Sequence, residues 1–249
     1  MTLKPVQTIL VPLVDQYSLS AVNYAQMLSE AYQKPLSLLC LNPALESPAR
    51  ALNVHYTLSS DRLSAALAQA VANEDCVMIV WPRPGSRRLI QRQLNACRDL
   101  RIPYFFIPHN WSPRPPQRVL MPISFLIEDR EKAAWGRSLH RQFASHFTLL
   151  KPRDKGTRAA KNVDYIAAFF QKNAIPYTLI QGRKSSFKND KEALKDYAHS
   201  SDLMVVTASR EYGLDDQFFG PKELGLIHKS PLPLMMLNPR ADLYILCGD

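Results

Sequence analysis

The residues whose types and spacing could support chemistry lie in one loop near the C-terminal end. The apolar, strand-like run LMVV at 203–206 leads into the polar loop TASREYGLDDQFFG at 207–220 and then a helix-length segment at 221–228. Loops at the carboxyl ends of parallel strands form the usual ligand crevice of α/β proteins. Arg210 in this loop could therefore bind a phosphate or a carboxylate side-on. The alternative is a weak surface ion pair of Arg210 with an acidic neighbour, Glu211, Asp215 or Asp216.

Internal similarity divides the chain into two halves of the same kind. ILVPLV at 9–14 is echoed by VLMPIS at 119–124, and IPYFFIP at 102–108 is echoed by LPLMMLNP at 232–239. Amphipathic segments of helix length lie between the apolar runs, at 18–32, 61–72, 88–100, 129–143, 159–173, 190–199 and 221–228. Strands that alternate with helices of about 10–15 residues indicate a parallel, doubly wound sheet. The sequence therefore predicts an α/β protein with two domains in tandem.

A proline-rich segment separates the two halves. The sequence PHNWSPRPPQ at 108–117 follows a strand-like run and has the composition of a stiff linker. We therefore predict an N-terminal domain at 1–112 and a C-terminal domain at 113–249.

Composition and motifs exclude several classes of protein. The chain has 249 residues, of which 46% are hydrophobic and 21% charged, as is usual for a soluble globular protein. No apolar run approaches the roughly 18 residues of a membrane span, and no signal core precedes the first strand, so we expect a cytoplasmic protein without a membrane partner. The four cysteines and six histidines form no metal-ligand pattern, so no metal site is expected. The sequence also lacks a GxSxG elbow, an HExxH motif and a full P-loop, so we expect no enzyme, although slow ATP hydrolysis is not excluded.

Positive charge is concentrated in two clusters of the second half. Residues 113–249 contain 21 Lys and Arg against 15 Asp and Glu. The first cluster comprises Lys151, Arg153, Lys155, Arg158 and Lys161, and the second comprises Arg183, Lys184, Lys188 and Lys191. The second cluster includes Phe187, which could stack on a base. Phosphate contacts would make these clusters a nucleic-acid surface, but no base-reading motif accompanies them, so solvated loops are the favoured interpretation.

The segment 203–236 resembles, position for position, the nucleotide-binding end of the universal stress protein family. ILVP at 9–12 and the tripeptide that begins at Asn23 add to the resemblance, and the repeated order of strands and helices extends it over nearly the whole chain. The resemblance implies two Rossmann-like domains of the adenine nucleotide alpha hydrolase-like type, each a five-stranded parallel sheet flanked by helices. It further implies ATP binding in many members, and dimerisation through the last strand of each domain.

The sequence departs from the family at the residues that hold the phosphates. Thr207 and Arg210 stand where the family has two loop glycines, and Pro221 stands where it has a hydroxyl group. Glycine lets the backbone approach a phosphate closely, and proline has no N–H to donate. Ser124 takes the place of an aspartate that contacts the nucleoside. The candidate ligand crevice of the second half comprises Ser124, Thr207, Ala208, Ser209, Arg210, Gly213, Gly220, Pro221 and Lys222.

By comparison with the family pattern, the first half has lost the phosphate loop. Thr207 and Pro233 are 26 positions apart, whereas Trp81 and Pro103 are 22 apart. A Gly-Ser pair begins at Gly85, but no earlier glycine accompanies it. We therefore expect nucleotide binding to be weaker in the first half than in the second.

Three functions remain open. The favoured one is a tandem stress-response protein that regulates or senses a ligand, with impaired or absent ATP binding and no cofactor. The alternatives are a switch that binds ATP or AMP through the C-terminal half and, less favoured, a basic module associated with nucleic acid. As partners we expect the two halves themselves, paired as a pseudo-dimer through 105–107 and 234–236, a further copy of the chain, and an unidentified protein.

Overall fold

In a computed structural model, the structure describes residues 7–14, 19–154, 158–208 and 222–238. The chain divides into two compact units, Met1–Arg114 with Leu214–His228, and Pro115–Gly213 with Lys229–Asp249. The change from the first unit to the second lies inside the predicted linker. The division differs from the predicted domains in that it assigns residues 214–228, and hence most of helix α9 (Lys222–Lys229), to the first unit.

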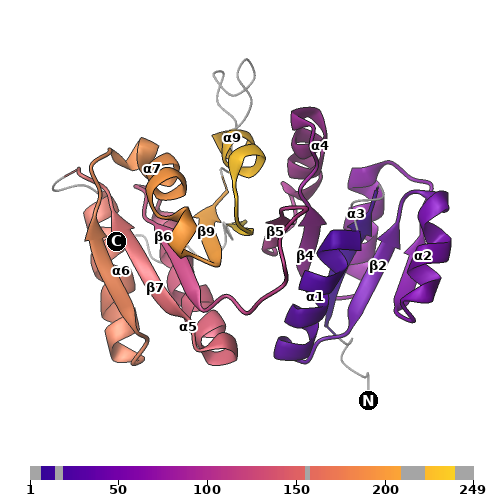
Figure 1. Cartoon of the computed structure of the whole chain (residues 1–249), viewed down its shortest axis with the longest axis horizontal. Helices are drawn as coiled ribbons and strands as arrows, with labels where there is room; N and C mark the ends of the chain where they lie inside the picture. Colours follow the sequence, from indigo (N-terminus) through magenta and orange to yellow (C-terminus); the bar gives the residue numbers. More distant parts are fainter. Residues whose placement is uncertain (1–6, 15–18, 155–157, 209–221, 239–249) are drawn as a thin grey trace. The chain divides into compact units, whose positions relative to one another are not determined.

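The first unit contains a parallel sheet with strands in the order β3-β2-β1-β4-β5. Figure 1 shows β2, β4 and β5 of this sheet together with the helices of the unit. Its elements in chain order are β1 (Thr8–Leu13), α1 (Leu19–Tyr32), β2 (Leu36–Cys40), α2 (Glu46–Ala51), β3 (His55–Leu58), α3 (Leu63–Asn73), β4 (Cys76–Pro82), α4 (Arg87–Cys97) and β5 (Tyr104–Ile107). Strand β2 is buried along its whole length, and β1 and β4 are nearly so. Such continuous apolar strands are typical of a sheet with helices on both faces.

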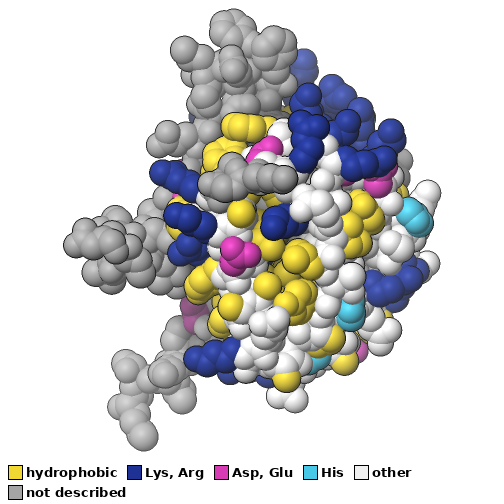
Figure 2. Space-filling view, turned by 90° about the vertical axis from the view of Figure 1, so that its left-hand side faces the viewer, with side chains coloured by type: hydrophobic (Ala, Val, Ile, Leu, Met, Phe, Trp, Pro, Cys, Tyr) yellow, Lys and Arg dark blue, Asp and Glu magenta, His cyan; other side chains and the backbone are white. Residues whose placement is uncertain are grey.

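The second unit contains a parallel sheet with strands in the order β10-β9-β6-β7-β8. Its main elements are β6 (Arg118–Pro122), α5 (Glu131–Phe143), β7 (His146–Lys151), α6 (Arg158–Lys172), β8 (Tyr177–Gln181), α7 (Asn189–Asp196), β9 (Leu203–Thr207) and β10 (Leu234–Leu237). The short 3₁₀ helices η3 (Ile127–Arg130), η4 (Ser186–Lys188) and η5 (Ala198–Ser200) flank α5 and α7. The face shown in Figure 2 carries many Lys and Arg side chains. The predicted fold class, α/β with parallel strands flanked by helices, is confirmed.

Close packing fixes α5 against α6 in the second unit. A Cβ atom added to Gly136 of α5 would lie 2.4 Å from Cζ of Phe170 in α6, so only glycine fits under this ring. Phe170 in turn packs against Phe147 of β7, with ring centroids 4.9 Å apart. The start of α5 contacts the carboxyl end of β6, because Lys132 donates a hydrogen bond to the Pro122 carbonyl oxygen.

One helix was absent from the predicted segments. Helix α2 is only six residues long, and Pro43 and Pro48 occur in and just before it. Both prolines lie in the first turn of a helix, η2 (Pro43–Leu45) or α2, where the missing N–H has no intrahelical partner to lose. The prolines therefore obscure the helical periodicity in the sequence without preventing the helix. Among the described ranges, no helix combines the length and the apolar character needed to cross a membrane.

Candidate functional site

Each sheet has a point at which its strand order reverses. In the first unit this point lies between β1 and β4, and in the second it lies between β6 and β9. The crevice outside the carboxyl ends of the strands at such a point is where open α/β sheets bind their ligands. These two crevices are therefore the candidate sites.

The crevice of the second unit contains a buried ion pair, Asp129 with Lys132. The side chains are 0% and 1% exposed, and Lys132 Nζ lies 3.0 Å from Asp129 Oδ1. Lys132 Nζ also donates a hydrogen bond of 2.6 Å to the carbonyl oxygen of Pro122, the last residue of β6. The ammonium group is thus fixed at the carboxyl end of this strand.

The Asp129 carboxylate joins the ends of β6 and β9. Thr207, the last residue of β9, donates its hydroxyl hydrogen bond to Asp129 Oδ1 over 2.5 Å. The backbone N–H of Ser124, just beyond β6, donates to Asp129 Oδ2. Two of the predicted site residues, Ser124 and Thr207, are thus brought together by a carboxylate from the same chain.

Two buried asparagines hold the loop that follows β6. Asn162 of α6 donates through Nδ2 to the carbonyl oxygens of Ser124 (3.1 Å) and Leu126 (2.6 Å). Asn189 of α7 donates through Nδ2 to the carbonyl oxygens of Ile123 (2.8 Å) and Leu150 (2.7 Å). These bonds fix the loop whose Ser124 N–H donates to Asp129, and a buried ion pair is stable only when such further hydrogen bonds satisfy its remaining atoms.

The polar groups at these two strand ends are engaged within the protein. The Thr207 hydroxyl and the Ser124 N–H both donate to Asp129, whose negative charge is balanced by Lys132. Ala208 is buried, and its N–H donates to the Leu237 carbonyl over 2.8 Å. Lys222 begins α9. The other predicted site residues lie outside the described part of the chain: Ser209, Arg210, Gly213, Gly220 and Pro221.

The sequence did contain a signal for the ion pair. Asp129 and Lys132 lie at the start of the helical segment predicted at 129–143. Lys132 is spaced along this helix as the buried residues Gly136, Leu139 and Phe143 are. A lysine at a core-facing position needs a partner, and the acidic residue three positions earlier could supply it.

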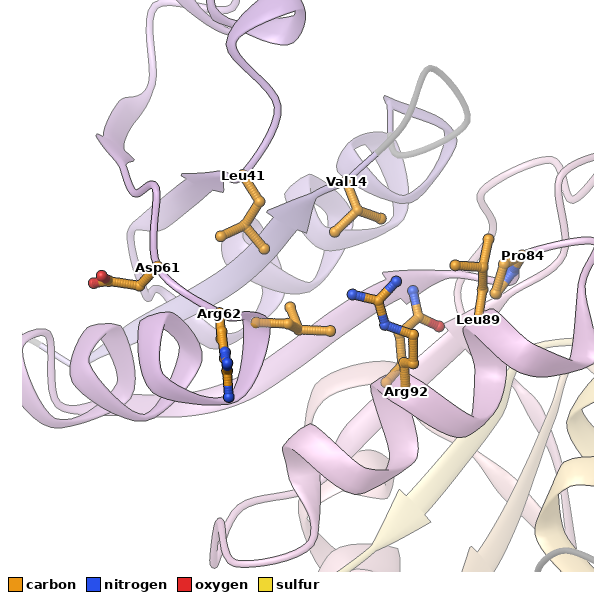
Figure 3. A pocket seen from close by; sticks show the side chains of 9 residues that line it. Val14, Leu41, Asp61, Arg62, Pro84, Leu89 and Arg92 are labelled. Carbon is orange, nitrogen blue, oxygen red and sulfur yellow. The ribbon is translucent and has the colours of Figure 1, made fainter.

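The crevice of the first unit contains an open pocket of about 280 Å³ (Figure 3). Its wall is formed by residues just after β1, β2 and β4, by residues at the start of α3 and by residues of the first two turns of α4: Val14, Leu41, Asp61, Arg62, Leu63, Pro84, Leu89, Arg92 and Gln93. The sequence did not single out this set, because its members come from five separate segments.

The pocket combines an apolar wall with positive charge and one unused polar atom. In Figure 3 the Arg92 side chain extends from α4 towards the space beneath Val14 and Leu41. Arg62 occupies the N-cap position of α3, and its side chain forms no capping hydrogen bond with the helix. Gln93 is 3% exposed, and its Oε1 has no hydrogen-bond partner among the described residues. An apolar pocket with a few convergent polar groups is the usual form of a small-molecule site.

Two of the buried cysteines, Cys76 and Cys97, have poorly reactive thiols. Burial raises the pKa of the Cys76 and Cys97 thiols to about 12, which leaves both protonated and poorly nucleophilic. Cys97 accepts a hydrogen bond of 3.3 Å from Nε1 of Trp81 in the core. The described ranges also contain no group of three or more His, Cys, Asp or Glu residues that could hold a metal ion.

Comparison with known proteins gives a match at the level of structure. No protein-family model matches the sequence, and no curated protein does. The solved structure of a universal stress protein from Archaeoglobus fulgidus DSM 4304 is 12% identical, with a TM-score of 0.74, and the match covers 94% of this chain and 97% of that one. A protein of unknown function from Pseudomonas aeruginosa PAO1, PA1789, is 14% identical, with a TM-score of 0.63 and coverage of 97% and 95%. The chain therefore has the fold of the universal stress proteins.

Proposed function

We propose that the protein is a stress-response regulator that senses a small anionic ligand through its first unit, and that its second unit has lost ATP binding. The observation that carries the proposal is the Asp129–Lys132 pair, which lies buried in the ligand crevice of the second unit. The pocket at the corresponding point of the first unit supports it.

The ion pair opposes nucleotide binding in two ways. A phosphate beside β6 and β9 would meet the Asp129 carboxylate instead of free donor groups. To make the donors available, the ligand would have to separate a buried pair, and breaking such a pair costs about 3–5 kcal/mol. That cost would weaken binding by roughly two to four orders of magnitude.

The pocket of the first unit fits a ligand smaller than ATP. Its volume of about 280 Å³ lies at the lower end of the range for small-molecule sites. Arg62 and Arg92 suit one carboxylate or phosphate group, because a guanidinium binds either through paired N–H donors. The amide of Gln93 can hydrogen-bond a polar group, while Leu41 and Leu89 contact an apolar body.

Calorimetry on the full chain tests the proposal. ATP, ADP and AMP are titrated beside a panel of small carboxylates and monophosphate esters. We expect saturable binding of a member of the small-anion panel that Arg92→Ala weakens at least tenfold. Arg87→Ala is the matched control, because Arg87 lies exposed at the start of the same helix but does not line the pocket.

Mass spectrometry of compounds that co-purify with the protein provides the second measurement. Recovery of ATP or AMP, with a nucleotide affinity that Arg92→Ala does not change, would overturn the proposal. That outcome would select the alternative, a nucleotide switch in the C-terminal half.

A further inference from the structure

The second unit carries a basic hollow, formed by residues of α7 and of the loop before it. It has a volume of about 370 Å³, and its wall consists of five cations and two acids: Arg183, Lys184, Lys188, Lys191, Lys195, Glu192 and Asp196. Lys and Arg side chains gather in the upper part of the face shown in Figure 2. The fold thus adds Lys195 to the predicted cluster of 183–191 and arranges the cluster around one concavity.

Both acids of the hollow are occupied by internal contacts. The Glu192 side chain is 1% exposed. Its two carboxylate oxygens accept hydrogen bonds from the backbone N–H groups of Arg183 (2.7 Å) and Lys184 (2.8 Å). Asp196 pairs with Arg183 over 2.7 Å. These contacts shape the loop and neutralise much of the charge of Arg183.

The four lysines keep their charge available. Lys184, Lys188, Lys191 and Lys195 are exposed, and within the described ranges none of their ammonium groups has an ion pair or a hydrogen bond. Five cations against two carboxylates leave the wall of the hollow with a net charge of +3, which attracts anions. The hollow therefore fits a ligand with several negative charges.

An exposed aromatic residue lies next in sequence to a lysine of the hollow. Phe187 directly precedes Lys188 in η4 and is 74% exposed. Phe125 braces its ring at a centroid distance of 4.6 Å. The N–H of Ser186 donates to Asp154 over 2.7 Å and helps to fix η4. One ring of this kind, held in place beside cations, is the arrangement on which an unpaired base stacks.

We propose that this surface binds single-stranded nucleic acid, with phosphates against the four lysines and a base on Phe187. An acidic protein would use the lysines but would gain little from the ring. A duplex keeps its bases stacked inside and offers none to Phe187. The inference is independent of the first-unit pocket, because the two sites share no residue.

Fluorescence anisotropy on the full chain tests the proposal, with labelled 12-nucleotide oligo(U) and oligo(dT) and a duplex of the same length. We expect both single strands to bind more tightly than the duplex. The affinity should fall as the salt concentration rises. Comparison of oligo(U) with oligo(dT) shows whether RNA or DNA is preferred. Lys184→Ala/Lys191→Ala should reduce the slope of log K against log salt by about 1.4, or about 0.7 for each lost phosphate contact. Phe187→Ala should weaken binding by roughly 5- to 150-fold without changing the slope.

Matched variants separate this surface from general basicity. Lys161→Ala/Lys172→Ala removes two exposed lysines of α6 in the same unit and should leave the slope unchanged. Phe187→Leu keeps an apolar side chain without a π face and should weaken binding as Phe187→Ala does. The proposal is overturned if no oligonucleotide binds, if both lysine pairs have equal effects, or if Phe187→Ala binds normally. Displacement by poly-glutamate at equal charge concentration would also overturn it and indicate an acidic protein partner.

Discussion

The buried ion pair of the second unit makes the substitution Lys132→Met informative. Methionine keeps the length and apolar stem of lysine but removes the ammonium group. Asp129 then remains 0% exposed, with hydrogen bonds from Ser124 and Thr207 but without its cation. The Pro122 carbonyl also loses its donor. Removing one partner of a buried pair destabilises a protein by about 3–5 kcal/mol, so we expect a loss of this size.

Urea unfolding, combined with hydrogen exchange resolved by peptide, measures the loss. Exchange should accelerate in peptides of the second unit, while peptides from 19–114 serve as an internal reference. The combined measurement matters because a chain with two units need not unfold in one step. Lys161→Met is the matched control: this exposed lysine lies on α6 of the same unit, and its loss should change stability by no more than about 0.5 kcal/mol.

A second variant distinguishes the ion pair from simple packing. Asp129→Asn, added to Lys132→Met, removes the unpaired charge but keeps an oxygen that can accept from Thr207. The double variant should recover at least half of the lost stability, because no buried charge remains. The reasoning is refuted if Lys132→Met costs less than about 1 kcal/mol, or if the double variant is no more stable than the single one.

Two further predictions concern packing and reactivity. Gly182→Ala should destabilise the second unit by about 1–3 kcal/mol in urea unfolding, since the new Cβ would lie 2.9 Å from the Lys151 carbonyl oxygen and 3.1 Å from Glu192 Oε2. Gly85→Ala is its control, with no atom within 4 Å of the new Cβ, and equal losses in the two variants would contradict the prediction. Cys97 should resist iodoacetamide at pH 8 in the folded protein and react in urea, because burial raises its pKa to about 12 and keeps the thiolate scarce. Peptide mass spectrometry reads the labelling, and rapid modification of Cys97 in the folded chain would count against its burial.

The local pattern of the sequence determined the fold class and most of the helices. The helix predicted at 159–173 is α6, Arg158–Lys172, because the spacing of its apolar residues depends only on its own turns. The apolar runs likewise indicated buried parallel strands, because the period of a strand is also local. Helix α2 was not predicted, because six residues that include a proline are too few to show a helical period.

Only the tertiary structure decided which polar groups meet. Asp129 and Thr207 are 78 residues apart, and they touch because β9 lies next to β6 in the sheet. The pocket of the first unit likewise draws on five segments between Val14 and Gln93. Strand order is set by long-range packing, which leaves no period in the sequence. The sequence could therefore name candidate residues at the strand ends, but only the folded chain placed a carboxylate between two of them.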